Sequence, residues 1–459
     1  MSEPLVIRGG TVFTPEGPQE VDVNVADGVI GGLEARGRAP AGATIVDANG
    51  LYVLPGAIDA HVHSRDPGFP EKEDFSSLTA AAAVGGVTTV IDMPNTVPAV
   101  DGPGVLEAKA ASALGRARVD FGLWGLVRSS STPEQLEGLA AAGAVGFKAD
   151  LGYAFSRSRR QVMYVADLDD PDLEAPPDYG TLTRLAPIVA KLGLPLAIHA
   201  EDPGMLASFR RPLVGYSDVL ASRPSEAEAV AIEAVAAIAQ QAHARLHIVH
   251  LSSALGLKAA ERASRPGSHI TIETCPQYLW LTDQDFGRLG TTMKMYPPIR
   301  TGADRTALVD GIAVGAITIV GTDHAPHTDE EKARSLDDAP AGSPGVQNLY
   351  LSCLELAKRL GDVWMAPRWV CEGPARLTGL DRRKGSIAPG FDADVVLVDP
   401  GRRTVVRAEG MHSRQRLGAM EGFEFGFEIK EVYLRGRLVA AHGQPLGLAA
   451  GRFVRPGSN

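Results

Sequence analysis

The central part of this chain, residues 55–380, alternates short apolar segments with helix-like segments, and this alternation constrains the fold more than any other feature. Eight segments are candidate strands: residues 57–61, 87–93, 119–126, 144–148, 196–199, 246–251, 270–274 and 317–321. Helical patterns lie between several of them, at residues 78–84, 105–114, 133–142 and 226–241, with Ser76 and Ser77 as a candidate cap of the first. Eight strands that alternate with helices predict an α/β fold, a (β/α)₈ barrel of the TIM type. An open doubly wound sheet is the rival, but no glycine-rich dinucleotide loop follows the first strand.

The two ends of the chain, residues 1–54 and 381–459, have short β-like segments punctuated by glycine and proline. These segments are residues 5–7, 21–25, 29–30 and 44–46 in the first part, and residues 394–398 and 432–436 in the second. Neither part has enough strands for a good core alone. We therefore expect both ends to pair into one small β-sandwich beside the barrel, followed by a C-terminal tail. Two independent β domains are the alternative.

The composition narrows the class of protein. Apolar residues make up 44% and charged residues 22% of the 459 residues, as in globular proteins. The formal charge of −10 argues against nucleic acid as a partner, because nucleic-acid-binding proteins usually have an excess of basic residues. An anionic ligand would have to bind to local positive groups. No run of about 18 apolar residues predicts a membrane span, and the first residues lack the features of a signal peptide. The three cysteines form no disulfide framework, which favours a cytoplasmic location.

Side chains suited to metal binding fall at the ends of the predicted strands. They are His61 and His63 at the first strand, Lys148 at the fourth, His199 at the fifth, His250 at the sixth and Asp323 at the eighth. In a barrel the carboxyl ends of all strands converge on one mouth. Four imidazoles and one carboxylate at that mouth predict a metal site, whereas separate structural roles for each residue are the alternative. Four further histidines match no strand end and receive no role: His243, His269, His412 and His442.

The predicted ligands are nitrogen and oxygen atoms without a thiolate. Such a set suits Zn²⁺, with Mn²⁺, Co²⁺ or Fe²⁺ as alternatives. One tetrahedral zinc with an open position needs fewer ligands, so two metal ions are expected. Lys148 is the odd member, because an ammonium beside two cations would be repelled. Burial readily lowers the pKa of a lysine. The neutral amine can then take up CO₂ to form a carbamate that bridges two metals. The alternative is a structural lysine behind a single metal.

The separated motifs resemble the cyclic amidohydrolases, which comprise dihydroorotases, allantoinases and hydantoinases. The resemblance covers nearly the whole chain and includes a β-sandwich made from both ends. It implies that His61, His63, carboxylated Lys148, His199, His250 and Asp323 are the metal ligands. It also implies that metals activate a water molecule and polarise the ring carbonyl, while Asp323 moves the proton from the water to the leaving ring nitrogen.

Three residues favour a substrate that carries a carboxylate. Arg65 lies two residues after His63 and could form a bidentate pair with a carboxylate. Asn95 follows the second predicted strand, and His327 follows the eighth. Dihydroorotases are similar at all three positions and use them to hold the ring carboxylate. An ion pair between Arg65 and a nearby acid such as Asp66 is the alternative.

Other features resemble hydantoinases. They include residues 273–279 and 345–347, and Tyr153, five residues past Lys148, where hydantoinases place a tyrosine that hydrogen-bonds the oxyanion. Packing alone is the alternative role for Tyr153. The turn at residues 297–300 resembles a family turn that presents backbone groups to the substrate. Residues 156–179, rich in charge and proline, form an excursion that either covers the mouth or is only a loop.

Three functions therefore stay open at this stage. The first is dihydroorotase, which interconverts dihydroorotate and N-carbamoyl-aspartate. The second is a hydantoinase, dihydropyrimidinase or allantoinase with the same metals and a different pocket. The third is a non-catalytic scaffold subunit, which would lack ligands, although none is missing here. We expect a small cyclic amide as the partner, neither nucleic acid nor membrane, and a homodimer or homotetramer as in the family.

Overall fold

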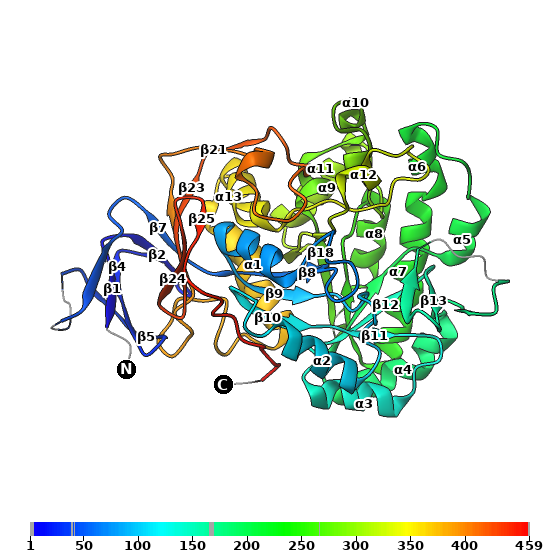
Figure 1. The fold of residues 1–459 in the computed structure, drawn as a ribbon, viewed down its shortest axis with the longest axis horizontal. Coiled ribbons are helices and arrows are strands. Elements are labelled where there is room, and N and C mark those ends of the chain that lie inside the picture. The colour runs from blue at the N-terminus through cyan, green and yellow to red at the C-terminus, as the bar shows by residue number, and fades with distance from the viewer. Residues whose placement is uncertain (1–3, 38–39, 41, 165–168, 266, 458–459) are drawn as a thin grey trace.

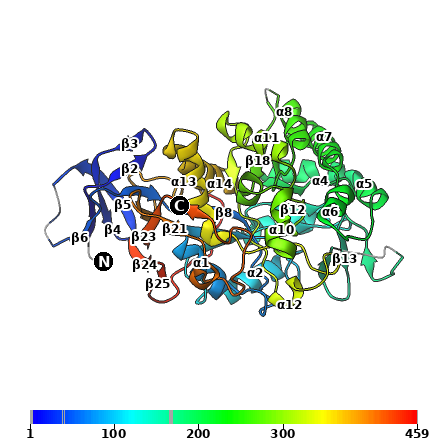
Figure 2. The same cartoon turned by 90° about the horizontal axis from the view of Figure 1, so that it is seen from above.

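The computed structural model describes residues 4–37, 40, 42–164, 169–265 and 267–457. Its centre is a parallel β-barrel wrapped by helices, and a β domain lies at one side of it (Figures 1 and 2). The predicted α/β barrel of the TIM type is confirmed. No helix among these residues is both long and apolar enough to cross a membrane.

The barrel strands form two parallel sheets that meet at their edges. One sheet has the order β10-β9-β8 and the other β11-β12-β16-β17-β18-β19. The strands are β8 (Ala57–Val62), β9 (Val87–Asp92), β10 (Asp120–Leu123), β11 (Gly125–Val127), β12 (Phe147–Asp150), β16 (Pro195–His199), β17 (Arg245–Ile248), β18 (Ile270–Thr274) and β19 (Ile319–Val320). The ring closes where Val62 bridges to His324 in parallel orientation.

The third predicted strand is interrupted at Trp124, which separates β10 from β11. The Trp124 backbone N–H donates to Asp92 O (3.0 Å), and its indole N–H donates to Ala60 O (3.0 Å). The strand therefore changes partners at one buried aromatic residue and still fills one position of the barrel. The eighth strand is shorter than predicted, because only Ile319 and Val320 are paired.

Helices cover the outside of the barrel (Figure 1). The longer ones are α1 (Phe75–Val84), α2 (Pro103–Ala113), α3 (Pro133–Ala142), α4 (Tyr179–Leu192), α7 (Ser225–Ala242), α8 (Ala254–Ala263), α11 (Gly302–Ala313) and α13 (Leu349–Arg359). Helix α3 begins and ends as predicted, since Thr132 and Gln135 form a capping box and Gly143 adopts a left-handed conformation at its end. The predicted serine cap of α1 is wrong: the Asp74 carboxylate accepts the Ser77 N–H, so the helix begins at Phe75.

Strands from both ends of the chain share one sheet. Its order is β25-β24-β23-β20-β7-β2-β3, in which β20 (Val395–Asp399) pairs with β7 (Tyr52–Pro55). The other strands are β2 (Thr11–Thr14), β3 (Gly17–Gln19), β23 (Glu428–Leu434), β24 (Arg437–Ala441) and β25 (Gln444–Pro445). A four-stranded sheet lies against it, formed by β5 (Val29–Ala35), β4 (Val21–Ala26), β1 (Leu5–Arg8) and β6 (Thr44–Asp47).

Apolar side chains from distant parts of the sequence fill the space between these two sheets. They include Ile7 and Val23 from the first part and Val395 and Leu397 from the last. Apolar burial of this kind is the main stabilising term in such a core. The exact domain boundaries at residues 54 and 380 stay a prediction.

The predicted excursion at residues 156–179 contributes to a small antiparallel sheet that begins at Ala154, and its residues 165–168 lie outside the part of the chain that the structure describes. The sheet consists of β13 (Ala154–Ser156), β14 (Gln161–Met163) and β15 (Leu173–Glu174). Tyr164, directly after β14, contacts residues of the mouth. Its hydroxyl accepts a hydrogen bond from Asn95, and its ring centroid lies 4.8 Å from that of Tyr153. This side of the excursion therefore borders the barrel mouth.

Candidate active site

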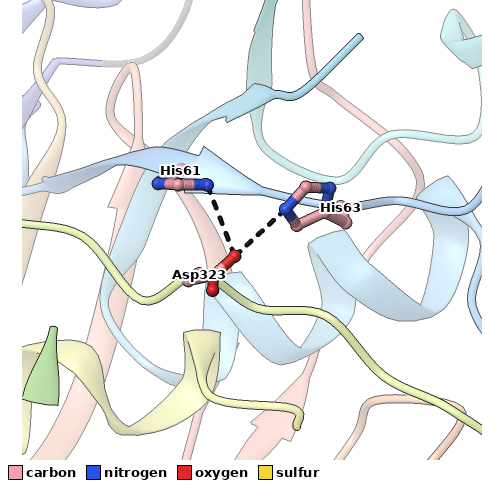
Figure 3. A group of neighbouring side chains, drawn as sticks. All are labelled: His61, His63 and Asp323. Carbon is pink, nitrogen blue, oxygen red and sulfur yellow. Dashed lines mark hydrogen bonds and ion pairs between the residues drawn. The ribbon is translucent and has the colours of Figure 1, made fainter. Parts of the chain in front are cut away.

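Three predicted ligands meet at the barrel mouth (Figure 3). His61 lies on β8, His63 directly follows it, and Asp323 lies beyond β19. Asp323 Oδ1 is 3.3 Å from His61 Nε2 and 3.0 Å from His63 Nε2. One ligand atom from each residue lies within 4.8 Å of the others, close enough for all three to hold one metal ion.

A second pair of imidazoles lies beside this group. His199 Nδ1 is 2.8 Å from His250 Nε2, and the His250 ring lies 5.3 Å from the His61 ring between centroids. His199 ends β16, whereas His250 follows β17 by two residues. The two groups together bring all four predicted histidines and the aspartate into one place.

Lys148 lies in the same interior. It is the second residue of β12, which Asp150 ends, so the predicted position of Lys148 at the strand end is wrong by two residues. Its side chain is buried, and its ammonium group donates to the Asp150 carboxylate. Since side chains alternate along a strand, Asp150 shares the inward face with Lys148.

The backbone at three site residues is in the left-handed region that favours glycine. The φ angles are +59° at Arg65, +41° at His250 and +49° at Asp323. Such conformations persist in non-glycine residues only where the surroundings determine them, and they gather at functional sites. The conformations of these three residues therefore agree with a functional site at the mouth.

Carboxylate and amide oxygens hold the outer nitrogen of three imidazoles. Glu273 Oε1 lies 2.8 Å from His61 Nδ1, Asn95 Oδ1 lies 2.7 Å from His63 Nδ1, and Glu201 Oε2 lies 2.8 Å from His199 Nε2. Metal-binding histidines use their second nitrogen in this way, which sets the ring orientation. The inner nitrogens then face the interior of the mouth. This donor set, four imidazoles with an aspartate and outer carboxylates, fits a divalent metal centre.

The protonation states of the histidines and of Asp323 also favour metal binding. Burial lowers the pKa of His63, His199 and His250, which favours the neutral imidazole that binds metals. Burial alone would raise the pKa of Asp323, but His61 and His63 outweigh it and lower that pKa, so the carboxylate is ionised.

The residues predicted to bind a carboxylate lie together beside this centre. Arg65 is buried, and its Nε donates to Pro326 O at 3.2 Å while its Nη2 lies 3.1 Å from His327 Nε2. The alternative ion pair with Asp66 is not formed, because Asp66 pairs with Arg116 at 2.6 Å. Among the residues that the structure describes, no carboxylate lies within ion-pair distance of Arg65.

Tyr153 borders the other side of the site. It is 6% exposed, and its ring centroid lies 5.0 Å from that of His199. Burial raises its pKa well above the usual value, so the phenol keeps its proton. Its hydroxyl accepts a hydrogen bond from Arg223 Nη2 at 3.1 Å.

Sequence reasoning missed several residues that touch these groups: Asp150, Tyr164, Glu201, Arg223 and Glu273. Glu201 had a signal, since it follows His199 by two residues and therefore shares its face. Glu273 is the last but one residue of β18, which was recognised as a strand. Arg223 follows the short helix α6 (Tyr216–Ser222) and had no signal in the sequence.

Comparison with known proteins agrees with this geometry. Residues 52–439 match the model of the Amidohydrolase family. An allantoinase of Rubrobacter xylanophilus is 36% identical over 472 residues, covering 98% of this chain and 97% of the relative. A dihydroorotase of Halobacterium salinarum is 37% identical over 433 residues, covering 92% and 94%. The L-hydantoinase (dihydropyrimidinase) of Arthrobacter aurescens superposes with a TM-score of 0.90 at 27% identity, covering 99% of this chain and all of that one.

A barrel with this ligand set and these relatives defines a class of hydrolases, and the chain belongs to the amidohydrolase family. The prediction of a cyclic amidohydrolase, an enzyme that hydrolyses carbon–nitrogen bonds of cyclic amides, is confirmed. These comparisons do not single out one ring as the substrate.

Proposed function

We propose that this enzyme opens a cyclic amide that carries a carboxylate, with dihydroorotate as the substrate and N-carbamoyl-aspartate as the product of the reversible reaction. The observation that carries the proposal is the buried guanidinium of Arg65, which lies at the mouth beside His327 without a carboxylate partner among the described residues. A buried cation normally has an anionic partner. A substrate carboxylate supplies that partner.

His327 and the ion pair between Lys72 and Glu331 lie beside Arg65. Burial and the nearby Arg65 charge lower the pKa of His327 to about 3, so this imidazole is neutral and offers a hydrogen bond rather than a charge. Lys72 Nζ lies 3.3 Å from His327 Nδ1, and it is paired with Glu331 at 2.8 Å. Asn95, three residues after β9, completes the proposed set for the two carboxylate oxygens.

His61, His63, Lys148, His199, His250 and Asp323 are the proposed metal ligands. One or two divalent ions held there, with Zn²⁺ as the first choice, would lower the pKa of a bound water and polarise the ring carbonyl. Asp323 is ionised and lies among the ligands, so it can accept the proton of the attacking water and return it to the leaving ring nitrogen. Tyr153 keeps its proton and can donate a hydrogen bond to the oxyanion that develops on the carbonyl.

Lys148 is the proposed carbamate. Its amine is buried among the histidines, close enough to influence His61, His199 and His250 electrostatically. Protein prepared in ¹³C-labelled bicarbonate should show a carbamate carbonyl signal in NMR and two metal ions per subunit. A single metal ion without this signal would assign Lys148 the structural role instead.

Allantoin or a hydantoin is the second candidate substrate. The relatives named allantoinase favour it, and so does Tyr153 at the position where hydantoinases place a tyrosine. Both rings lack a carboxylate. A homodimer or homotetramer also stays a prediction, which size-exclusion chromatography with light scattering would test.

Turnover of dihydroorotate, hydantoin, dihydrouracil and allantoin by the metal-loaded enzyme tests the proposal. We expect dihydroorotate to be the best substrate, and Arg65→Ala to lower its kcat/KM about a hundredfold, as for the loss of one partner of a buried charge pair. Metal content should stay unchanged. Arg118→Ala, which removes a half-buried arginine far from the mouth, is the matched control. A neutral ring as the best substrate, with turnover unaffected in Arg65→Ala, would assign the second candidate function.

A further inference from the structure

Arg223 connects two parts of the site that are far apart in the sequence. Its Nε lies 3.1 Å from both carboxylate oxygens of Glu201, and its Nη2 donates to the Tyr153 hydroxyl at 3.1 Å. Glu201 in turn holds His199. One planar guanidinium therefore touches the carboxylate behind a proposed metal ligand and the hydroxyl of the proposed oxyanion donor.

The guanidinium has little freedom to move. It stacks over the Tyr296 ring, with Cζ 3.9 Å from the ring centroid. The backbone of Arg223 is held as well, because Arg300 Nη1 donates to Arg223 O at 2.8 Å. Arg300 belongs to the Pro297–Arg300 turn that the sequence analysis singled out. The turn thus supports the position of Arg223 in addition to any contact of its backbone with the substrate.

The hydrogen bond from Arg223 decides where the Tyr153 proton points. A phenol oxygen can accept a hydrogen bond and donate its own proton. Here its accepting side faces Arg223, and no acceptor for its proton is present among the described residues. The Tyr153 ring lies against His199, on the side of the metal ligands. The free O–H is therefore available to a substrate atom in the mouth.

We propose that Arg223 is a positioning residue that holds Tyr153 with its hydroxyl proton directed at the reacting carbonyl oxygen. No proton is transferred: Tyr153 donates a hydrogen bond to the oxyanion, and Arg223 keeps the phenol oxygen in place. This inference rests on the proposed function of Tyr153. Lysine is no substitute, because a single ammonium lacks the planar fork that reaches Glu201 and Tyr153 together.

A double-mutant cycle on the metal-loaded enzyme tests the inference, with the fastest substrate of the panel. Tyr153→Phe should lower kcat about a hundredfold, as for the loss of one oxyanion donor. Arg223→Lys keeps the charge beside Glu201 and should lower kcat about tenfold with little change in KM. In the double variant kcat should equal that of Tyr153→Phe alone. The proposal would be overturned if Arg223→Lys lowered kcat by the same factor in the presence of Tyr153 and in the Tyr153→Phe variant. It would also be overturned if Arg223→Lys did not lower kcat.

Arg128→Lys is the matched control, because Arg128 also lies over an aromatic ring near the excursion, that of Phe155 at 4.3 Å, and does not touch Tyr153. This variant should leave kcat and the cycle unchanged. If Arg223→Lys does not fold, Arg223→Gln, which keeps a planar donor, takes its place in the same cycle.

An NMR measurement checks the inference without turnover. Enzyme labelled with [¹³Cζ]tyrosine shows a Tyr153 signal that is assigned by its absence in Tyr153→Phe. This signal should shift in Arg223→Lys and stay in place in Arg128→Lys, while the metal content of both variants matches that of the unmodified enzyme. Loss of metal in Arg223→Lys would overturn the proposal, because Arg223 would then act through Glu201 and His199. An unchanged kcat in Tyr153→Phe would refute the role of Tyr153 itself, and the NMR shift would still report the contact.

Discussion

Two clusters of side chains in this protein bring possible ligand atoms together, one partly buried and one fully buried, and they differ in the cations that lie beside them. At the mouth, His61, His63 and Asp323 face one another. At the junction between the barrel and the β domain, a second cluster consists of Asp120 on β10 and Asp392 and Asp394 before β20. By geometry alone either group could hold a metal ion.

The junction cluster already contains its cations. Lys384 Nζ lies 2.8 Å from Asp120, 3.1 Å from Asp392 and 2.6 Å from Asp394, and Arg435 Nη1 lies 2.6 Å from Asp120. Burial alone would lower the pKa of Lys384, but the three carboxylates outweigh it and raise that pKa. A group of ligand atoms therefore indicates a metal site only where no lysine or arginine already pairs with those atoms.

The largest expected effect is the loss of metal after a substitution in the mouth cluster, with no loss after a substitution in the junction cluster. His61→Ala should remove metal from the purified enzyme and lower kcat/KM by about a thousandfold or more, because water activation is lost. Asp392→Asn should keep the full metal content, measured by inductively coupled plasma mass spectrometry on folded protein. The comparison fails if Asp392→Asn loses metal and His61→Ala does not.

The next effect concerns stability at the junction. Lys384→Met leaves three buried carboxylates without their shared ammonium, so we expect the free energy of unfolding to fall by about 3–5 kcal/mol. Urea denaturation followed by circular dichroism measures it. Lys191→Met is the control, because Lys191 is 75% exposed and its pair with Glu137 spans 3.5 Å, which predicts a change below ~1 kcal/mol. Equal losses in both variants would show that the junction cluster contributes no more than a surface pair.

The smallest effect is a pH dependence at the mouth. Burial, and then Arg65, lower the pKa of His327 to about 3, whereas an unfolded histidine titrates near 6.5. Between these pH values the unfolded chain binds the proton and the native protein does not, so stability falls as the pH falls. Linkage gives a loss of ~2 kcal/mol from pH 7 to pH 5.

His327→Gln should remove this part of the pH dependence, as measured by urea denaturation at both pH values. An exposed site offers the contrast, because Lys191→Met removes only an exposed ammonium group and should keep the same dependence on pH. An identical loss between pH 7 and pH 5 in His327→Gln and in the unmodified protein would contradict the lowered pKa.

Much of the site could be anticipated because its proposed ligands follow strands, and parallel strands of a barrel end at one mouth. His61, His63, His199, His250 and Asp323 were placed by this rule, and the structure brings them together. Lys148 shows the limit of the rule, since the strand extends two residues further and adds Asp150 to the interior. When the end of a strand is predicted from its apolar residues, polar residues that continue the strand and pair with its neighbours are left out of the prediction.

Contacts between elements could not be anticipated in the same way. Arg223 follows a short helix, Glu273 lies on a strand, and Tyr164 belongs to the excursion. Each reaches the site from a different direction, and nothing in their local sequence specifies that direction. The serine cap assigned to α1 failed because the helix begins three residues earlier than predicted, at Phe75, and Asp74 caps it.

The sequence by itself determined the class of fold and the metal-binding chemistry, because the period of the apolar residues and the types of side chain at strand ends are local properties. The tertiary structure alone decided the charge balance around those side chains. Asp66 pairs with Arg116 and not with Arg65, so Arg65 lies beside the mouth without an acidic partner among the described residues. Lys384 pairs with the carboxylates of the junction cluster. Electrostatic energy depends on distances and burial in three dimensions, and these exist only once the chain has folded.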